Sequence, residues 1–155
     1  MGATERFTDA ARAVGIEPGI RRFPEGTKTA ADAARAVGCD VAQIVKSLVF
    51  IADDGAVIAF TSGANRVDPA KLAAVAGASE TRRASPEEAR AATGFAVGGT
   101  PPFGHPTPLP GYVDPDLLTF EEVWVAAGTP DSVFPLPPSE LLRATGARPA
   151  DFTEG

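Results

Sequence analysis

One stretch of the chain, residues 93–105, combines residue types that could build a wall of a small-molecule site. It reads Thr-Gly-Phe-Ala-Val-Gly-Gly-Thr-Pro-Pro-Phe-Gly-His. Glycine permits turns that a Cβ would obstruct and proline fixes its own φ, so the loop should be rigid. The amides of Gly98, Gly99 and Thr100 would then be free of bulky side chains and could face a substrate. The same composition also suits an ordinary tight turn between two strands.

Two further side chains, those of Lys46 and His105, could take part in chemistry. Lys46 stands at the entry to the apolar run 48–51, where it could extend to solvent or bind a phosphate or carboxylate as a point charge. His105 is the only imidazole, and it could line a substrate site or bond to nearby backbone. No Gly-x-Ser-x-Gly motif accompanies it, so a nucleophilic triad is not indicated.

Metal and cofactor sites of the usual kinds are not predicted. One cysteine, Cys39, and one histidine cannot supply the ligands of a nitrogen- and sulfur-based zinc or iron site in a single chain. Gly98-Gly99 is not followed by Gly-Lys-Ser/Thr, and no Gly-x-Gly-x-x-Gly motif opens a helix. We therefore expect no metal and no cofactor.

The charge distribution limits the classes of partner. The formal net charge is −6, and all of it falls in residues 79–155, which carry five basic and eleven acidic side chains. A non-specific nucleic-acid binder would need a basic stripe, so any contact with a polyanion should be local and should use the first half of the chain together with Arg82 and Arg83. The sequence has no apolar run long enough to span a membrane and no signal peptide, so no membrane partner and a cytoplasmic location are expected.

Short helices and short strands must position the candidate residues. Capping residues, glycines and apolar periodicity predict a hairpin with strands at 44–51 and 56–61, and further elements before and after it. Helices are expected at 4–14, 30–37, 69–76, 86–93 and 139–145, the first and last capped by Thr4 and Ser139, with a helical turn at 40–43. Further strands are expected at 20–23, 112–113, 117–118, 123–126 and 132–136, with a final edge at 151–152. This order predicts one α/β domain over residues 1–155, a mixed sheet with small helices outside, and not a doubly wound fold.

Three segments together resemble the YbaK-type family of trans-editing aminoacyl-tRNA deacylases. This family includes the editing domain inserted in bacterial prolyl-tRNA synthetases and free-standing, ProX-like relatives. The first segment, 43–50, is similar to the family's lysine-bearing strand, and the second, 93–104, contains its Gly-x-x-x-Pro loop as Gly98 to Pro102. The third, 123–129, is similar to the strand and glycine turn that close the pocket. The resemblance implies a compact YbaK-like α/β domain whose distorted sheet approaches a barrel.

The resemblance also implies a reaction, the hydrolysis of the ester that joins a wrong amino acid to tRNA. Lys46 would bind the phosphate of the terminal adenosine, and the backbone of Gly98, Gly99 and Thr100 would support the developing oxyanion. Water, a ribose hydroxyl or a substrate thiol would attack, without a metal or a protein nucleophile. The remaining substrate-binding positions would be Phe50, Pro101, Pro102, His105, Gly128 and Thr129.

Some features depart from the family pattern or stay open. Ala126-Ala127-Gly128 stands where some relatives have Ser-Gly-Gly, and Pro101 replaces a small polar residue, which leaves the amino acid undetermined. The partner would be the acceptor end of an aminoacyl-tRNA, with a synthetase as a candidate second partner and tRNA contacts at Arg21, Arg22, Lys28 and Arg66. The leading prediction is a deacylase that acts in trans on a small mischarged amino acid. The alternatives are a non-catalytic module that binds an aminoacyl or nucleotide end, and a hydrolase of an unrelated ester.

Overall fold

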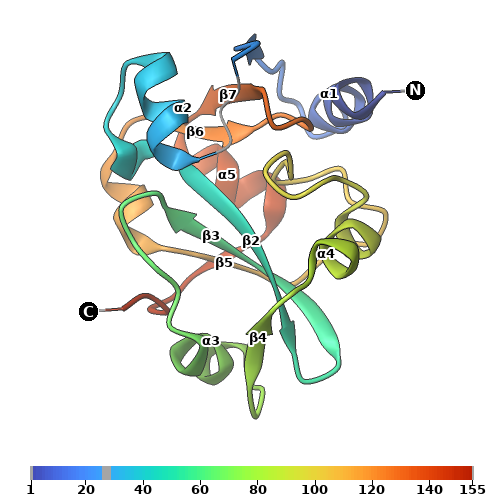
Figure 1. Ribbon diagram of the computed structural model, residues 1–155, viewed down its shortest axis with the longest axis vertical. Helices are drawn as coiled ribbons and strands as arrows, with labels where there is room; N and C mark the ends of the chain where they lie inside the picture. Colours follow the sequence, from blue (N-terminus) through green and yellow to red (C-terminus); the bar gives the residue numbers. More distant parts are fainter. Residues whose placement is uncertain (1, 26–28, 155) are drawn as a thin grey trace.

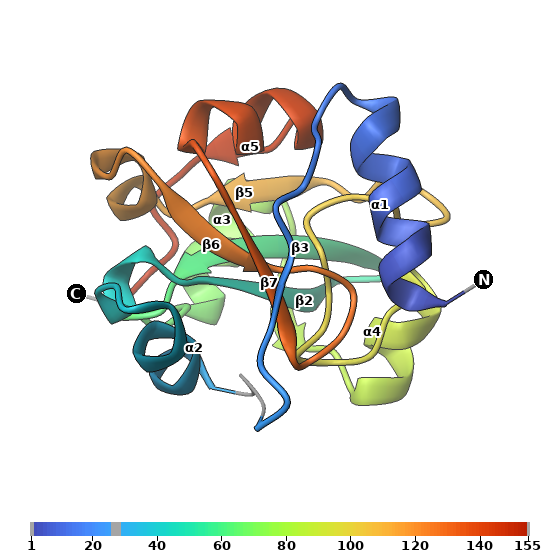
Figure 2. The ribbon, with the colours of Figure 1, turned by 90° about the horizontal axis from the view of Figure 1, so that it is seen from above.

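In the part of the chain that the structure describes, two β-sheets cross face to face, and five short helices pack around them (Figures 1 and 2). The computed structural model describes residues 2–25 and 29–154. The larger sheet has the strand order β4-β2-β3-β5-β8, and the smaller has the order β1-β7-β6. Their strands are β1 (Arg21–Arg22), β2 (Val45–Ala52), β3 (Gly55–Ser62), β4 (Thr81–Arg83), β5 (Gly111–Val113), β6 (Val123–Ala126), β7 (Ser132–Leu136) and β8 (Arg148–Pro149). Both parallel and antiparallel pairs occur in the larger sheet, which confirms the predicted mixed α/β class.

The hairpin of β2 and β3 is the longest pairing in the molecule. Its register runs from Val45 opposite Ser62 to Ala52 opposite Gly55, which confirms the predicted hairpin. On the other side of β2, the unpredicted strand β4 pairs only with residues 50–52. The first half of β2 therefore has no β4 partner on that side.

Local capping signals set the bounds of three helices as predicted. Thr29 caps α2 (Ala30–Val37), Asp68 caps α3 (Pro69–Ala76), and Ser85 and Glu88 form the capping box of α4 (Pro86–Thr93). The 3₁₀ turn η1 (Val41–Gln43) also lies where a helical turn is predicted.

The predicted caps of the first and last helices are wrong. Helix α1 (Ala3–Ala13) begins after Gly2, so Thr4 lies in its first turn. Helix α5 (Pro138–Thr145) begins at Pro138, and Ser139 lies inside it. Proline at the first helical position has a suitable φ and needs no N–H partner, so the helix can start one residue before the serine.

Two predicted strands are also wrong. Leu117 and Leu118 lie in the 3₁₀ helix η2 (Pro115–Thr119), because Asp114 caps its start by accepting from Asp116 N–H. Two apolar residues alone do not separate a strand from a helical turn. The last strand is β8, and residues 151–152 form no strand of their own. The chain still pairs one residue later, where Thr153 makes an isolated antiparallel bridge to Val67, and Phe152 is a fully buried core residue.

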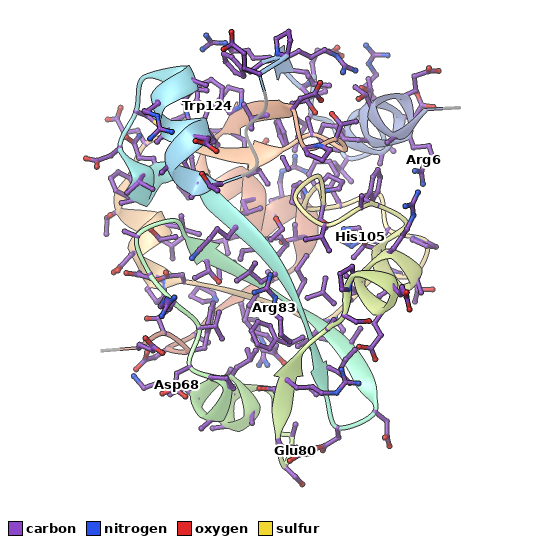
Figure 3. All side chains as sticks on the ribbon, viewed as in Figure 1. Arg6, Asp68, Glu80, Arg83, His105 and Trp124 are labelled. Carbon is purple, nitrogen blue, oxygen red and sulfur yellow. The ribbon has the colours of Figure 1, made fainter. Side chains whose placement is uncertain are left out.

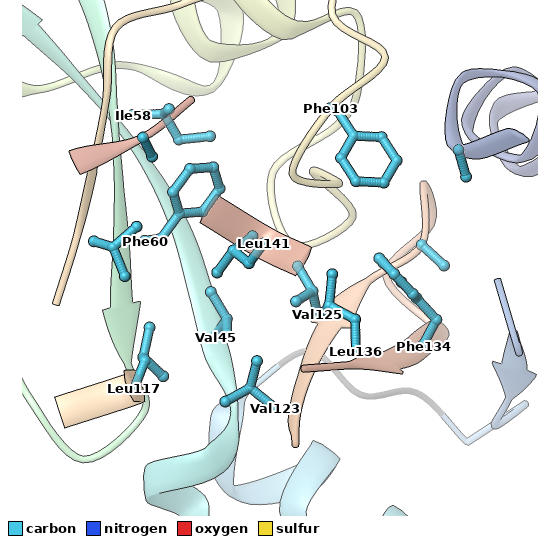
Figure 4. Close-up of a cluster of buried hydrophobic side chains, with 14 of the residues drawn as sticks. Val45, Ile58, Phe60, Phe103, Leu117, Val123, Val125, Phe134, Leu136 and Leu141 are labelled. Atoms are coloured by element: carbon cyan, nitrogen blue, oxygen red, sulfur yellow. The ribbon is translucent and has the colours of Figure 1, made fainter. Parts of the chain in front are cut away.

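The main core lies between the two sheets (Figure 4). The larger sheet contributes Val45, Ile58 and Phe60, and β6 and β7 contribute side chains such as Val125 and Phe134. A second cluster on the outer face of the larger sheet includes Phe50, Leu72 and Phe152, with Leu48 packed against it. The sheets remain two and do not close, so the distorted mixed sheet is confirmed but a closed barrel is not formed. Within the described residues no helix is both long and apolar enough to cross a membrane.

Candidate functional site

A pocket of about 560 Å³ opens where the first half of β2 meets the smaller sheet. Its walls come from β2, from β6 and β7, from α2, from the start of α4 and from the loop at 97–100. Figure 3 labels Arg83 and Trp124, which belong to opposite parts of this wall. Its polar side chains are those of Thr29, Lys46, Ser47, Arg83 and Thr100. Of the predicted catalytic residues, Lys46, Gly98 and Thr100 line the pocket.

The pocket extends along the part of β2 that β4 does not cover. Side chains alternate along a strand, so Lys46 and Leu48 lie on the outer face while Val45, Ser47 and Val49 lie on the inner face. The core clusters agree, because Leu48 packs with the outer cluster and Val45 belongs to the inner one. All five residues line the pocket, so side chains from both faces of β2 contribute to it.

Lys46 lies among other cations on the outer side. Its Nζ donates to the carbonyl oxygen of Asn65 at 2.5 Å. Burial lowers the pKa of the Lys46 amine, and the charges of Arg83 and Arg66 lower it further, while Asp114 raises it. Like charges held close together repel each other, so an anion bound here would relieve the repulsion.

Arg83 is a pocket residue that the sequence analysis did not place in the site. Its guanidinium lies over the Phe50 ring, 5.9 Å from the centroid, and within the described residues it makes no ion pair. The neighbouring Arg82 instead donates two hydrogen bonds to Glu88, at 2.7 and 2.8 Å, and thereby lowers the pKa of that carboxyl to about 2. If β4 had been predicted as a strand, Arg82 and Arg83 would have been assigned to opposite faces of it, because the side chains of consecutive strand residues point to opposite faces.

The loop at 96–100 forms a tight turn beside the pocket. Gly99 N–H donates to the carbonyl oxygen of Ala96 at 3.0 Å, and Gly98 has a positive φ of 87°, which glycine adopts without strain. Gly98 and Thr100 line the pocket, whereas Gly99 does not. Within the described residues, the amides of Gly98 and Thr100 have no hydrogen-bond acceptor. Two of the three predicted amides are therefore unpaired in the part of the chain that the structure describes.

The third sequence segment supports this loop from behind. A Cβ at Gly99 would lie 2.8 Å from the Cα and carbonyl carbon of Thr129, so only glycine allows this contact. The Thr129 hydroxyl hydrogen-bonds to Asp131 and Ser132, each at 2.6 Å, and holds its own turn. Gly128 packs in turn against the backbone of Ala3 at the start of α1. Gly128 and Thr129 lie behind the loop and do not line the pocket.

The other predicted substrate-binding residues lie outside the pocket. Phe50 is buried under Arg83 in the outer core, and Pro101 is buried as well. Pro102 and His105 line a separate hollow of about 140 Å³. His105 Nε2 lies 2.9 Å from the carbonyl oxygen of Pro101, and burial lowers the pKa of its imidazole.

The four predicted tRNA-contact residues differ in their surroundings. Arg21 is exposed and lies 5.5 Å from the ring centroid of Trp124, which lines the pocket. Arg22 is already engaged, because it donates to the Thr4 hydroxyl at 2.9 Å and lies 3.8 Å from Asp131. Arg66 is exposed and close enough to Lys46 to lower its pKa. Lys28 lies outside the described residues.

The wall of the pocket under α2 suits a small apolar group. It is lined by short side chains and one ring: Ala30, Ala33, Ala126, Val133 and Trp124. Trp124 is only 8% exposed and packs with Ala33 and Val133 in a third cluster under α2. The Trp124 ring forms part of the pocket wall, and the small alanine side chains leave space for a ligand.

The sequence model of one family, described as the aminoacyl-tRNA editing domain, matches residues 24–144. The chain belongs to this family. Its members act on aminoacyl-tRNA, and editing is a hydrolytic activity. The resemblance to the YbaK-type family is thus confirmed.

Relatives and a solved structure align with most of this chain. The chain is 31% identical to the uncharacterized protein YwhH of Bacillus subtilis over 81% of this chain and 80% of that protein. It is 27% identical to EbsC of Enterococcus faecalis, a proposed Cys-tRNA(Pro)/Cys-tRNA(Cys) deacylase, over 84% and 80% of the two chains. A solved structure of a proposed trans-editing enzyme for prolyl-tRNA synthetase superposes with a TM-score of 0.94 at 47% identity, covering 100% of this chain and 99% of that one. A proline–tRNA ligase of Solidesulfovibrio magneticus is 33% identical over 69% of this chain but only 18% of the ligase.

Proposed function

We propose that this editing domain is a deacylase that hydrolyses, in trans, the ester of a small mischarged amino acid on tRNA. The observation that carries the proposal is a single pocket lined both by the cations Lys46 and Arg83 and by small apolar side chains. A substrate that fits must carry an anion beside a small apolar group. The 3′ end of a tRNA charged with a small amino acid has both.

Each part of the substrate has a matching group in this pocket. The phosphate of the terminal adenosine binds to Lys46 and Arg83, and the amino-acid side chain enters the space between Ala33 and Val133. The ester carbonyl lies near the amides of Gly98 and Thr100, which donate to its oxygen as negative charge develops. Water, or a hydroxyl of the terminal ribose, attacks the carbonyl carbon. The bond to the ribose oxygen breaks, that oxygen takes up a proton, and the amino acid leaves, directly or after hydrolysis of the new ester.

The proposal needs no metal and no protein nucleophile. Positioning of the ester and stabilisation of the oxyanion by fixed amides can together supply a large part of the rate enhancement. We also propose that the editing domain comprises residues 1–155, because elements outside the matched range join the same cores. Phe7 of α1 lies in the inner cluster, and Phe152 lies in the outer cluster.

Deacylation of a tRNA panel tests the function directly. The protein is incubated with tRNAs charged with Ala, Cys, Ser, Thr or Pro and labelled at the 3′ end, and the loss of each aminoacyl group is followed. Hydrolysis of at least one of the small aminoacyl esters is expected. Binding of charged tRNA without any hydrolysis would contradict the enzyme and favour a binding module, and hydrolysis of simple esters alone would favour an unrelated esterase.

Arg83 provides a first test of the cationic lining. Replacing Arg83 with glutamine is expected to raise KM about three- to tenfold, because a partly solvated contact with phosphate is lost. The matched control is Arg82→Gln, whose guanidinium is already bound to Glu88, and its KM should stay within about twofold of the wild type. Equal effects of the two changes would show that general charge, and not the position of Arg83, attracts the tRNA.

A further inference from the structure

Asp114 is the only charged side chain that is buried among the described residues. It directly follows β5 and is 1% exposed. Its Oδ1 accepts from the N–H of Asp116 and caps η2. Its Oδ2 accepts from the Ser62 N–H at 3.1 Å and from the side-chain amide of Asn65 at 2.8 Å. The carboxylate therefore fixes the chain just after β3 as well as the start of η2.

The backbone of Asn65 connects this carboxylate to Lys46. The Asn65 carbonyl oxygen accepts from the Lys46 Nζ at 2.5 Å, and the Asn65 N–H donates to the carbonyl of Ser62 at 2.9 Å. A Cβ at Gly63 would lie 2.4 Å from the carbonyl oxygen of Val41, so the turn after β3 packs closely on η1. Asn65 is thus held through its side chain and its N–H while its carbonyl oxygen binds the lysine amine.

The charges around Lys46 give Asp114 a second effect on this amine. Burial lowers the pKa of the Lys46 amine, and so do the charges of Arg83 on β4 and Arg66 in the loop after β3. The charge of Asp114 raises the same pKa, because an opposite charge favours the protonated form. In the described part of the chain Asp114 forms no ion pair, so no direct contact with a cation neutralises it.

We propose that Asp114 is a positioning residue for Lys46 and acts on it through Asn65. The carboxylate holds the Asn65 amide, the Asn65 carbonyl holds the Lys46 amine, and the negative charge of Asp114 favours the protonated amine. A charged N–H donor is thereby kept at a fixed point of the pocket wall. This inference rests on the proposed function, because it names the residue that holds the phosphate-binding lysine of that site.

Titration of the lysine amines tests the electrostatic part of the proposal. The chain has three lysines, Lys28, Lys46 and Lys71, so the NMR signals of labelled lysine Cε atoms can be assigned with Lys46→Met and Lys71→Met. Asp114→Asn keeps the size of the side chain and removes its charge, so the Lys46 amine should lose its proton at a lower pH than in the wild type. The matched control, Asp116→Asn, removes an exposed charge that solvent screens, and it should shift the titration less.

A double-mutant cycle tests whether Asp114 acts through Lys46. Asp114→Asn is expected to lower kcat/KM for deacylation about two- to tenfold, the range for one hydrogen bond. In a Lys46→Met protein the same change should lower kcat/KM no further, because the group that Asp114 positions is gone. A residue that only supports the fold would lower kcat/KM in both backgrounds.

Asn65→Ala gives a second route to the same test. It removes the side-chain amide that binds Asp114 and Asp116 but keeps the backbone carbonyl that accepts from Lys46. The expected loss of kcat/KM is again about two- to tenfold in the wild type and absent in the Lys46→Met background. Circular dichroism checks that each variant is folded. If Asp114→Asn is not, the cycle with Asn65→Ala decides, and equal losses in both backgrounds overturn the positioning role.

The outcomes separate this positioning role from the proposed function. An unchanged Lys46 titration in Asp114→Asn, or a further loss of kcat/KM when that change is added to Lys46→Met, overturns the positioning role. If the wild type deacylates charged tRNA, either result leaves the function standing. Absence of deacylation by the wild type overturns the function, and the positioning role in that reaction falls with it.

Discussion

Replacing Lys46 with methionine is expected to lower kcat/KM for deacylation about 10- to 150-fold. This decrease in kcat/KM corresponds to the loss of a charged hydrogen bond to phosphate, which contributes about 1.5–3 kcal/mol. Methionine keeps most of the aliphatic length of the side chain and removes the amine. Arg83 and Arg66 remain nearby, but neither places a hydrogen-bond donor where the Lys46 amine lies, beside the carbonyl oxygen of Asn65.

The same change should leave the fold largely intact. Burial and neighbouring arginines lower the pKa of Lys46, so the protonated amine is less favourable in the folded chain than in the unfolded one. Loss of the bond to Asn65 offsets part of the gain from removing this charge. The melting temperature should therefore change by no more than a few degrees, roughly the effect of 1 kcal/mol in a domain of this size.

Lys71 offers the matched control for Lys46. It is a partly exposed lysine whose Nζ donates to the Thr153 carbonyl and lies 3.6 Å from Asp151, away from the pocket. Lys71→Met should retain kcat/KM within about twofold. Undiminished activity of Lys46→Met, or an equal loss in both variants, would contradict the role assigned to Lys46.

Replacing Gly99 with alanine is expected to lower kcat about a hundredfold, because a misplacement of about 1 Å in a catalytic loop can have that effect. A Cβ at this position would lie 2.8 Å from two backbone atoms of Thr129 and 3.0 Å from Pro130 N. Backbone atoms cannot rotate away, so the loop and the turn must separate. The amides of Gly98 and Thr100 would then no longer point at the ester carbonyl.

Activity should fall further than stability in this variant. Overpacking of this kind costs about 1–3 kcal/mol in the free energy of unfolding, which leaves a typical domain folded. The matched control is Gly55→Ala in the β2–β3 turn, where an added Cβ meets no atom within 4 Å and φ is not positive. Parallel losses of activity and stability in Gly99→Ala would identify the loop as an ordinary structural turn.

Local interactions made much of this fold predictable from the sequence. The capping residues Thr29, Asp68 and Ser85 act within three residues of themselves, and each begins the helix that it predicts. The hairpin follows from an apolar run on each side of a two-residue turn. Where two local signals competed, as at Pro138 and Ser139, the backbone preference of proline set the start of the helix.

The sequence by itself determined which residues are candidates for the site, whereas the tertiary structure decided which of them meet. Lys46, Gly98 and Thr100 line one pocket, while His105 and Pro102 line another and Gly128 and Thr129 lie behind the loop. The position of Arg83 in the pocket depends on β4, which pairs with β2 for three residues and is followed by α4. Pairing between strands some thirty residues apart depends on how the whole chain packs, and no local pattern in the sequence records where such a pairing stops.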